Sequence, residues 1–168
     1  MTTPIKYPTP SHRVATLFVL AGLALALGLS ACSSAPSRAG AVAGLSDRVA
    51  ATAADTAAGL TGRPYRYGGA SPSGFDCSGL VHYSYARAGQ TVARSTDTLW
   101  RTSAPISLRE IRRGDLLFFD QEGKKSSHLG IWLGDGRFVH APSSGGKVRV
   151  DRLESDYWQR HFVAARRL

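Results

Sequence analysis

Residues 127–141 read Ser-His-Leu-Gly-Ile-Trp-Leu-Gly-Asp-Gly-Arg-Phe-Val-His-Ala. Two short apolar runs flank a Gly-Asp-Gly triplet, and such a triplet between β-forming residues predicts a hairpin. The loop length decides which face each side chain takes, because a shift of one residue turns every side chain of a strand over. A two-residue loop at Asp135 and Gly136 would pair Ile131 with His140 and would place the two histidines of this segment on opposite faces.

A three-residue loop would bring His128 and His140 together on one face. It pairs Leu133 with Arg137 and Gly130 with His140, which leaves the two imidazoles as diagonal neighbours about 7–8 Å apart at the backbone. The last glycine of the triplet suits the left-handed position that closes such a loop. We therefore predict the three-residue loop.

The rest of the chain divides into a helical part and a later β-rich part. Helical patterns cover 47–58, with Ser46 as N-cap and Gly59 as stop, and 78–88, which Gly89 ends. Beyond residue 114, short apolar runs separated by turn residues predict strands of a mainly antiparallel sheet. These runs lie at 116–119, 129–133, 138–141, 148–153 and 161–165. Helices followed by strands predict an α+β domain.

Cys77 lies directly before the second predicted helix. A helix N-terminus lowers the pKa of a thiol, so we expect a reactive cysteine here, although a lone cysteine is more often a small buried apolar residue. A cysteine nucleophile needs an imidazole as base and a third polar group to orient it. We expect Cys77 to dock against the face that carries His128 and His140. The alternative is that each histidine caps or packs independently, as we predict for His82 and His161.

The first 31 residues have the pattern of an export signal. Lys6 and Arg13 precede an apolar run at 14–29, which is shorter than the ~20 residues that span a bilayer. Small residues then lead into Cys32, as in a bacterial lipoprotein signal, which is cut before a cysteine that receives acyl chains. An uncleaved anchor helix and an ordinary signal peptide are the alternatives.

The predicted organisation is therefore a signal peptide at 1–31, the lipidated Cys32 with a flexible tether to residue 45, and one domain at 46–168. The 168-residue chain has a formal charge of +9, which favours an anionic partner such as anionic lipid or a carboxylate-rich polymer. No nucleic-acid motif is present in the sequence. We expect an exported monomer that is anchored to a membrane through Cys32. In a bacterium with two membranes, this is the outer membrane, with the domain facing the periplasm.

Five blocks of the chain occur in a characteristic order. They are Arg63-Pro64-Tyr65-Arg66-Tyr67-Gly68-Gly69, Phe75-Asp76-Cys77-Ser78-Gly79-Leu80, Gly114-Asp115-Leu116-Leu117-Phe118-Phe119, Ser127-His128-Leu129-Gly130-Ile131-Trp132-Leu133-Gly134 and Phe138-Val139-His140-Ala141. Together they resemble the NlpC-type peptidoglycan cysteine peptidases. Tyr157-Trp158 and Ala164-Ala165-Arg166-Arg167 look closer still to the outer-membrane lipoprotein branch, the murein endopeptidases.

The resemblance implies a papain-like α+β domain that hydrolyses amide bonds in the stem peptides of peptidoglycan. It implies Cys77 as nucleophile, His128 as general base, His140 as the group that orients His128, and Tyr65 as part of the oxyanion site. It matches four further positions to the substrate groove: Asp76, Ser78, Arg94 and Ser95. No metal or other cofactor is expected. Residues 92–99 depart from the family pattern. The resemblance therefore does not determine the shape of the groove or which bond is cut.

The resulting hypothesis is a cysteine endopeptidase that cuts the D-Ala–diaminopimelate or the γ-D-Glu–diaminopimelate bond through an acyl-enzyme. One alternative is a catalytically silent lipoprotein that binds peptidoglycan. Another is an amidase or acyltransferase that uses the same thiol.

Overall fold

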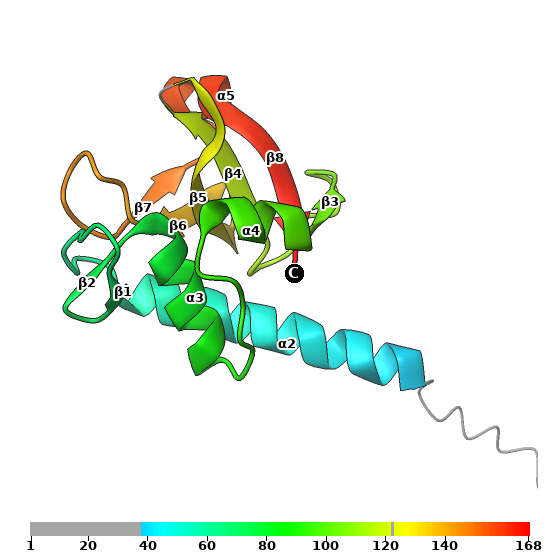
Figure 1. Cartoon of the computed structure of the whole chain (residues 1–168). Helices are drawn as coiled ribbons and strands as arrows, with labels where there is room; N and C mark the ends of the chain where they lie inside the picture. Colours follow the sequence, from blue (N-terminus) through cyan, green and yellow to red (C-terminus); the bar gives the residue numbers. More distant parts are fainter. Residues whose placement is uncertain (1–37, 122) are drawn as a thin grey trace, which may run out of the picture. The chain divides into compact units, whose positions relative to one another are not determined.

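A six-stranded antiparallel sheet with the strand order β3-β8-β4-β5-β6-β7 forms the centre of the computed structural model (Figure 1). The structure describes residues 38–121 and 123–168, so the predicted signal peptide and Cys32 lie outside the described residues. The strands are β3 (Ala104–Ile106), β4 (Leu116–Gln121), β5 (Lys124–Gly134), β6 (Arg137–His140), β7 (Arg149–Arg152) and β8 (Phe162–Arg167). The antiparallel sheet and its helices confirm the predicted α+β class.

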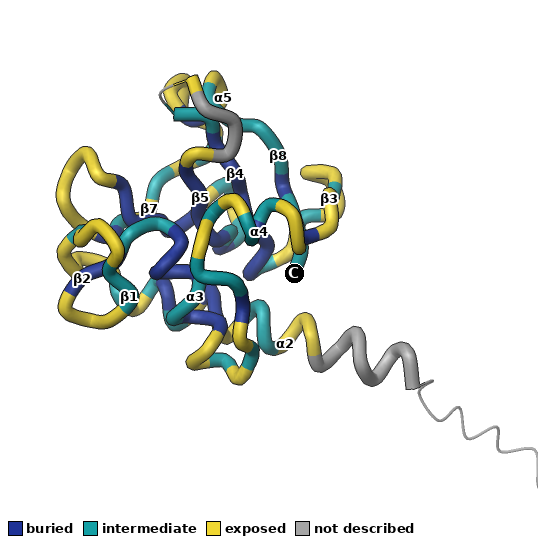
Figure 2. The backbone as a smooth tube through the Cα atoms, viewed as in Figure 1, coloured by how far each residue is buried: buried dark blue, intermediate teal, exposed yellow. Residues whose placement is uncertain are grey.

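Two helices, α2 (Arg38–Gly59) and α3 (Cys77–Arg87), pack against each other and against one face of the sheet. The buried core lies where they meet the strands (Figure 2). Five elements were not predicted: α4 (Thr96–Thr102), α5 (Asp156–His161), β3, and the strands β1 (Ala70–Ser71) and β2 (Gly74–Phe75) of a short hairpin. Each is only a few residues long, which is too short for a hydrophobic period to be recognised in the sequence.

Helix α2 begins earlier than we predicted. It starts at Arg38 and continues past Ser46, the predicted N-cap, so the prediction of a flexible segment was wrong for residues 38–45. That prediction relied on the absence of a hydrophobic period, whereas alanine and leucine favour a helix without one. The predicted apolar face is confirmed, because Ala53 and Ala57 are completely buried. Within the described part of the chain, no helix has the length and apolar character of a membrane span.

Helix α3 ends at the stop that we predicted, and it begins with a side-chain cap that we did not predict. Asp76 is its N-cap, and one carboxylate oxygen accepts the backbone N–H of Gly79 at 2.6 Å. Ala88 is the C-cap, and Gly89 follows with a φ of 95°, in the left-handed region that glycine adopts easily. These two ends place Cys77 as the first residue of the helix.

The β5–β6 hairpin has the register that we predicted for its strands. Ile131 pairs with Val139, which sets Gly130 opposite His140. Side chains two residues apart on a strand share a face, so His128 lies on the same face as His140.

The loop of this hairpin, however, differs from the predicted one. Gly134 pairs with Arg137, so the loop has two residues, and Asp135 and Gly136 both have a positive φ, at 52° and 73°. This is the geometry of a tight primed turn. The pairing shifts between Trp132 and Gly134, and this irregularity takes up the extra residue. A two-residue loop is thus compatible with two histidines on one face, because the bulge restores the register.

Candidate active site

The imidazoles of His128 and His140 lie in direct contact inside the protein. Both side chains are buried, at 4% and 0% exposure, and Nε2 of His128 lies 2.8 Å from Nδ1 of His140. On its other side, Nε2 of His140 lies 3.0 Å from a carboxylate oxygen of Asp151 on β7. The three side chains form a continuous hydrogen-bonded row across β5, β6 and β7, of which the sequence analysis identified the two histidines.

Burial lowers the pKa of both His128 and His140, because a charged imidazole loses its hydration inside the protein. The contact between the rings lowers the pKa of His128 further, since two adjacent positive charges repel. The negative charge of Asp151 partly offsets this by raising the pKa of both rings. Burial raises the pKa of Asp151 itself, but His140, Trp158 and Arg149 outweigh that effect and lower it overall. Near neutral pH, the row therefore consists of two neutral imidazoles and a carboxylate.

Cys77 approaches this row from the other side of the sheet. Helix α3 packs with Leu129 and Val139, whereas His128 lies beside Phe119 on the opposite face. The body of the helix therefore packs on the face opposite to the two histidines, whereas we expected Cys77 itself to dock against their face. Its first residue, Cys77, nevertheless shares a cavity of about 100 Å³ with His128.

The thiol of Cys77 has several polar neighbours. The hydroxyl of Thr96 lies 3.6 Å from the sulfur, and the backbone N–H groups of Ser78 and Leu129 also bond to it. Burial raises the pKa of the thiol, and the carboxylate of Asp76 adds to this, while the hydrogen bonds lower it in part. The lowered pKa that we predicted from the helix N-terminus was thus wrong, because burial outweighs the helix end. A base is needed to remove the proton.

A groove of about 570 Å³ passes along Cys77 on the solvent side. Tyr65 lines both this groove and the small cavity beside the thiol. Burial raises the pKa of its phenol, and a negative charge on Cys77 would raise it further, so the hydroxyl keeps its proton and can donate. Tyr67, at 90% exposure, is an aromatic side chain that also lines the groove.

The other four predicted groove residues lie together in its wall. Both carboxylate oxygens of Asp76 accept from Arg94, and Arg94 also donates to the hydroxyl of Ser78 at 2.9 Å and to the carbonyl of Gly69 at 3.1 Å. Ser95 is the N-cap of α4. The side chains of Asp76 and Arg94 are therefore largely occupied with each other and hold the start of α3 against the groove wall.

The two remaining histidines of the described chain lie elsewhere. Nδ1 of His82 lies 2.8 Å from the carbonyl oxygen of Val92, and Nδ1 of His161 lies 2.6 Å from the carbonyl oxygen of Tyr157. Neither lines the groove or the cavity beside Cys77.

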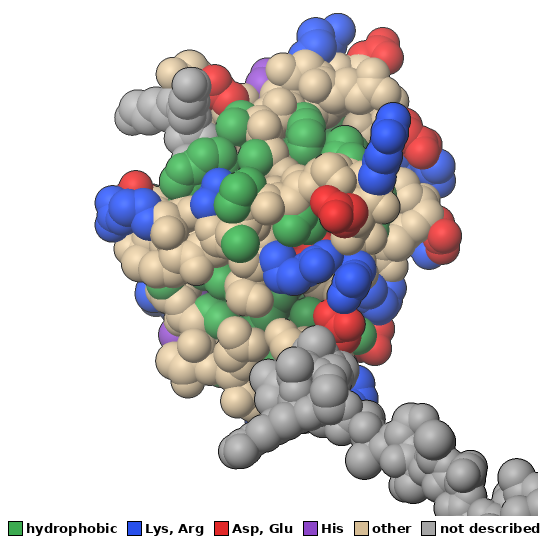
Figure 3. Space-filling model, turned by 90° about the vertical axis from the view of Figure 1, so that its right-hand side faces the viewer, with side chains coloured by type: hydrophobic (Ala, Val, Ile, Leu, Met, Phe, Trp, Pro, Cys, Tyr) green, Lys and Arg blue, Asp and Glu red, His purple; other side chains and the backbone are tan. Residues whose placement is uncertain are grey.

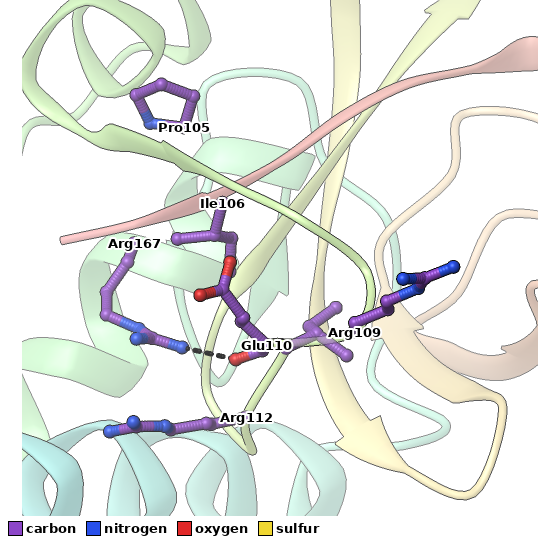
Figure 4. Close-up of a pocket in the computed structure, with 7 residues that line it drawn as sticks. Pro105, Ile106, Arg109, Glu110, Arg112 and Arg167 are labelled. Atoms are coloured by element: carbon purple, nitrogen blue, oxygen red, sulfur yellow. Dashed lines mark hydrogen bonds between the residues drawn. The ribbon is translucent and has the colours of Figure 1, made fainter.

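A second depression, of about 490 Å³, lies beside β3 and contains no cysteine or histidine among its lining residues (Figure 4). Two of its three arginines have protein partners: Arg167 bonds to the carbonyl of Glu110 and to Asp115, and Arg112 pairs with Asp47. On the face that carries β3, basic and acidic side chains accordingly lie next to one another (Figure 3). The groove at Cys77 is thus the pocket that offers a nucleophile.

Comparison with known proteins places residues 62–167 in the NlpC/P60 family. Among curated proteins, the chain is 43% identical over 112 residues to the murein DD-endopeptidase MepH of Escherichia coli, an alignment that covers 64% of this chain and 41% of MepH. It is 42% identical over 110 residues to the bifunctional muramidase/DL-endopeptidase CwlT of Bacillus subtilis, over 64% of this chain and 33% of CwlT. The chain thus spans less than half the length of these relatives.

Solved structures show the same fold. A Staphylococcus aureus protein of the NLP/P60 family, described as similar to lipoprotein, superposes with a TM-score of 0.64 at 37% identity over 72% of this chain and 41% of that one. The NlpC/p60 domain of the peptidoglycan hydrolase SagA superposes with a TM-score of 0.60 at 32% identity, over 71% of this chain and 98% of that domain. The family match covers more than half of the chain, and Cys77, His128 and His140 lie within it. The chain therefore belongs to the NlpC/P60 family.

Proposed function

We propose that this protein is a cysteine endopeptidase of peptidoglycan that cleaves amide bonds in the stem peptides or their cross-links. The arrangement of Cys77, His128 and His140 carries this proposal: the thiol and the first imidazole line one cavity, and the second imidazole bonds to the first at 2.8 Å. A nucleophile, a base and a group that orients the base are what acyl transfer from an amide requires. The names of the relatives MepH and CwlT support the same class of substrate.

In the first half of the reaction, His128 takes the proton of Cys77 as the sulfur attacks the carbonyl carbon of the substrate. The oxyanion that forms accepts hydrogen bonds from the hydroxyl of Tyr65 and from the backbone N–H of Cys77, which has no acceptor within the helix because it is the first residue of α3. The carbon–nitrogen bond then breaks, and the imidazolium of His128 gives its proton to the leaving amine. The product of this half is a thioester.

Water completes the reaction. His128, now neutral, takes a proton from a water molecule as its oxygen attacks the thioester carbonyl, and the same oxyanion site stabilises the second tetrahedral intermediate. The carbon–sulfur bond breaks, the peptide leaves as a carboxylic acid, and the thiol regains its proton. Each protonation step uses a group of this chain, so the mechanism requires no metal or other cofactor.

The groove wall supports a role in holding the stem peptide. Asp76, Ser78, Arg94 and Ser95 line the groove beside the thiol, and Tyr67 exposes its ring there. Two bonds are compatible with this class of substrate: D-Ala–diaminopimelate and γ-D-Glu–diaminopimelate. The two relatives are named for different bonds, since MepH is a DD-endopeptidase and CwlT a DL-endopeptidase.

We also propose that the protein is exported and anchored to a membrane through acyl chains on Cys32, with residues 46–168 as the enzyme domain. The basic segment, the apolar run at 14–29 and the small residues before Cys32 support this. Several acyl chains give stable membrane attachment. We propose that it acts as a monomer, which the presence of all the proposed catalytic groups within one chain supports.

The decisive experiment is digestion of purified sacculi by the full-length protein in detergent, with the released peptides identified by mass spectrometry. Cys77→Ala is the test variant, and Cys32→Ala is the matched control, because these are the two cysteines of the chain. We expect new peptide ends with the wild type and the control, and none with Cys77→Ala. The new ends identify the bond.

Three outcomes contradict the proposal. Sacculi that are bound but not cut would favour the silent binding lipoprotein. A released amine that does not come from a stem-peptide bond would favour an amidase, and a transferred acyl group would favour an acyltransferase.

A further inference from the structure

We infer that Asp151 is a positioning residue, which fixes the tautomers of His140 and His128 and so leaves Nδ1 of His128 free to take the proton of Cys77. This inference rests on the proposed function, because it assigns a fourth member to the same site. It concerns a strand, β7, that carries none of the residues that the sequence analysis assigned to catalysis.

The register of the sheet places Asp151 beside His140. His140 pairs directly with Arg149, and Asp151 lies two residues further along β7 on the same face. His128 stands in the same relation to His140 on the other side, because Gly130 is the residue opposite His140. The row from His128 to Asp151 thus follows two successive diagonal neighbours across three strands.

The direction of each hydrogen bond follows from the carboxylate. An ionised carboxylate accepts hydrogen bonds and donates none, so Nε2 of His140, at 3.0 Å from Asp151, must carry the proton. In a neutral imidazole the other nitrogen is then an acceptor. Nδ1 of His140 therefore accepts from Nε2 of His128 at 2.8 Å. Nδ1 of His128 is left as the unprotonated nitrogen, which is the state that a general base requires.

Asp151 is itself held by more than His140. Nε of Arg149 and the indole N–H of Trp158 both donate to the same carboxylate oxygen, Oδ2, at 3.1 and 3.0 Å. The side chain of Asp151 is 23% exposed, and that of His140 is fully buried. Three donors on one oxygen fix the carboxylate relative to the row.

Trp158 connects this carboxylate to both imidazoles. Its ring stacks on His128 with centroids 5.9 Å apart and contacts His140 edge-on at 4.9 Å. One side chain therefore packs on both rings and bonds to Asp151, which limits rotation of the rings out of the row.

Because three donors bond to Oδ2, replacement of Asp151 by an amide and replacement by an apolar residue should have different effects on the tautomers of the histidines. In Asp151→Asn, the amide oxygen can take the place of Oδ2 and accept the same bonds, so the tautomers are retained although the charge is lost. In Asp151→Leu, the acceptor is lost, and the proton of His140 is no longer fixed on Nε2. Asp135→Asn is the matched control, because Asp135 lies in the β5–β6 turn with its side chain 89% exposed and paired only with Arg137.

The test combines two measurements on the full-length protein. Nitrogen-15 NMR of labelled histidines reports which ring nitrogen carries the proton, and the rate of alkylation of Cys77 by iodoacetamide, followed by peptide mass spectrometry, reports thiolate formation. The charged and titratable groups that face His140 are His128, Arg149 and Asp151, so both are measured at several pH values.

We expect Nε2–H on both His128 and His140 in the wild type, in Asp151→Asn and in Asp135→Asn. In Asp151→Leu we expect a loss of the single His140 tautomer and alkylation that is slower by about 10- to 100-fold, the range known for removal of the hydrogen-bonding partner of a metal-ligating histidine. Unchanged tautomers and an unchanged rate in Asp151→Leu would overturn the inference. A proton on Nδ1 of His140 in the wild type would overturn it as well, and this measurement needs no variant to fold.

Failure of this inference is distinguishable from failure of the proposed function. Neither measurement uses peptidoglycan. If the tautomers are as expected but sacculi are not cut, the endopeptidase is refuted and Asp151 keeps its assigned role. If sacculi are cut but the tautomers are the opposite ones, the endopeptidase stands and the role of Asp151 is refuted.

Discussion

Arg94 donates a hydrogen bond from each terminal nitrogen to Asp76, at 2.9 Å to one carboxylate oxygen and 2.8 Å to the other. Asp76 is also the N-cap of α3 and accepts the backbone N–H of Gly68 at 2.9 Å. The residue immediately before Cys77 is therefore held by Arg94 and by the backbone at Gly68. Because an ion pair with two parallel hydrogen bonds has a defined geometry, it orients as well as stabilises.

Replacement of Arg94 by glutamine should reduce both stability and activity. The pair is partly screened by solvent, with side-chain exposures of 36% for Arg94 and 14% for Asp76, so we expect a loss of about 1–2 kcal/mol in the free energy of unfolding. Arg101→Gln is the matched control, since its ion pair with Asp97 is exposed at 64% and 71% and should contribute less than about 0.5 kcal/mol. Urea unfolding measures both, and equal losses would contradict the assignment.

Tyr65→Phe should lower kcat with little change in KM. Its hydroxyl is proposed to bond to the oxyanion, which exists only beyond the ground state, and loss of one such donor typically slows the reaction by about 100-fold or more. Tyr83→Phe is the control, because Tyr83 packs its ring edge-on against Phe75, 5.3 Å between centroids. Steady-state kinetics on released muropeptides checks this, and an unchanged kcat would exclude Tyr65 from the oxyanion site.

The pH profile should extend further into acid than an ordinary histidine base allows. Burial lowers the pKa of His128 from its usual value of 6.5, so the imidazole remains neutral, and able to accept a proton, below pH 6.5. The acid limb of kcat/KM is therefore expected well below pH 6.5. A limb near pH 6.5 would show that His128 titrates as if it were solvated.

Alkylation of Cys77 should rise with pH through the alkaline range. Burial raises the pKa of the thiol above its ordinary value of 9.0, so the thiolate is a minor species at neutral pH and increases as pH rises. Iodoacetamide kinetics in the absence of substrate measures this. A rate that is already maximal at pH 7 would indicate a stable thiolate–imidazolium pair instead.

Gly79→Ala should be strongly destabilising, because α3 approaches the preceding loop closely at this position. A Cβ atom there would lie 1.9 Å from the carbonyl oxygen of Gly69, which is backbone and cannot move aside cheaply. We expect a loss of at least about 1–3 kcal/mol, the usual cost of overpacking. Gly59→Ala is the control, since nothing lies within 4 Å of its added atom. Thermal unfolding compares them, and equal melting temperatures would contradict the close approach.

The sequence was most informative where one local rule acts alone. The stop at Gly89 predicted the end of α3. The predicted pairing of Gly130 with His140, which sets His128 and His140 on one face, is also confirmed. The loop of that hairpin could not be predicted, because a bulge and a loop residue shift the register by the same amount. The length of α2 was missed because the high helix propensity of alanine acts without any hydrophobic period.

Asp151 and Trp158 could not be assigned from the sequence, because their role depends on which strand lies next to β6. Asp151 lies in a run that predicts a strand, but its distance from His140 along the chain carries no information on pairing across the sheet. The raised pKa of Cys77 was also missed, since the helix end is visible in the sequence whereas the burial that outweighs it is not.

The sheet has a separate cluster of buried side chains on each face, and the proposed nucleophile and base belong to different ones. Cys77 packs with the larger helical cluster, whereas His128 contacts Phe119 and Trp158 of the smaller cluster. Proteins open locally in units of unequal stability, so release of α5 with Trp158 would disorganise the proposed base while α2 and α3 stay folded. Mild heating should then abolish hydrolysis while most of the helical circular dichroism remains, and amide hydrogens of α5 should exchange sooner than those of α3.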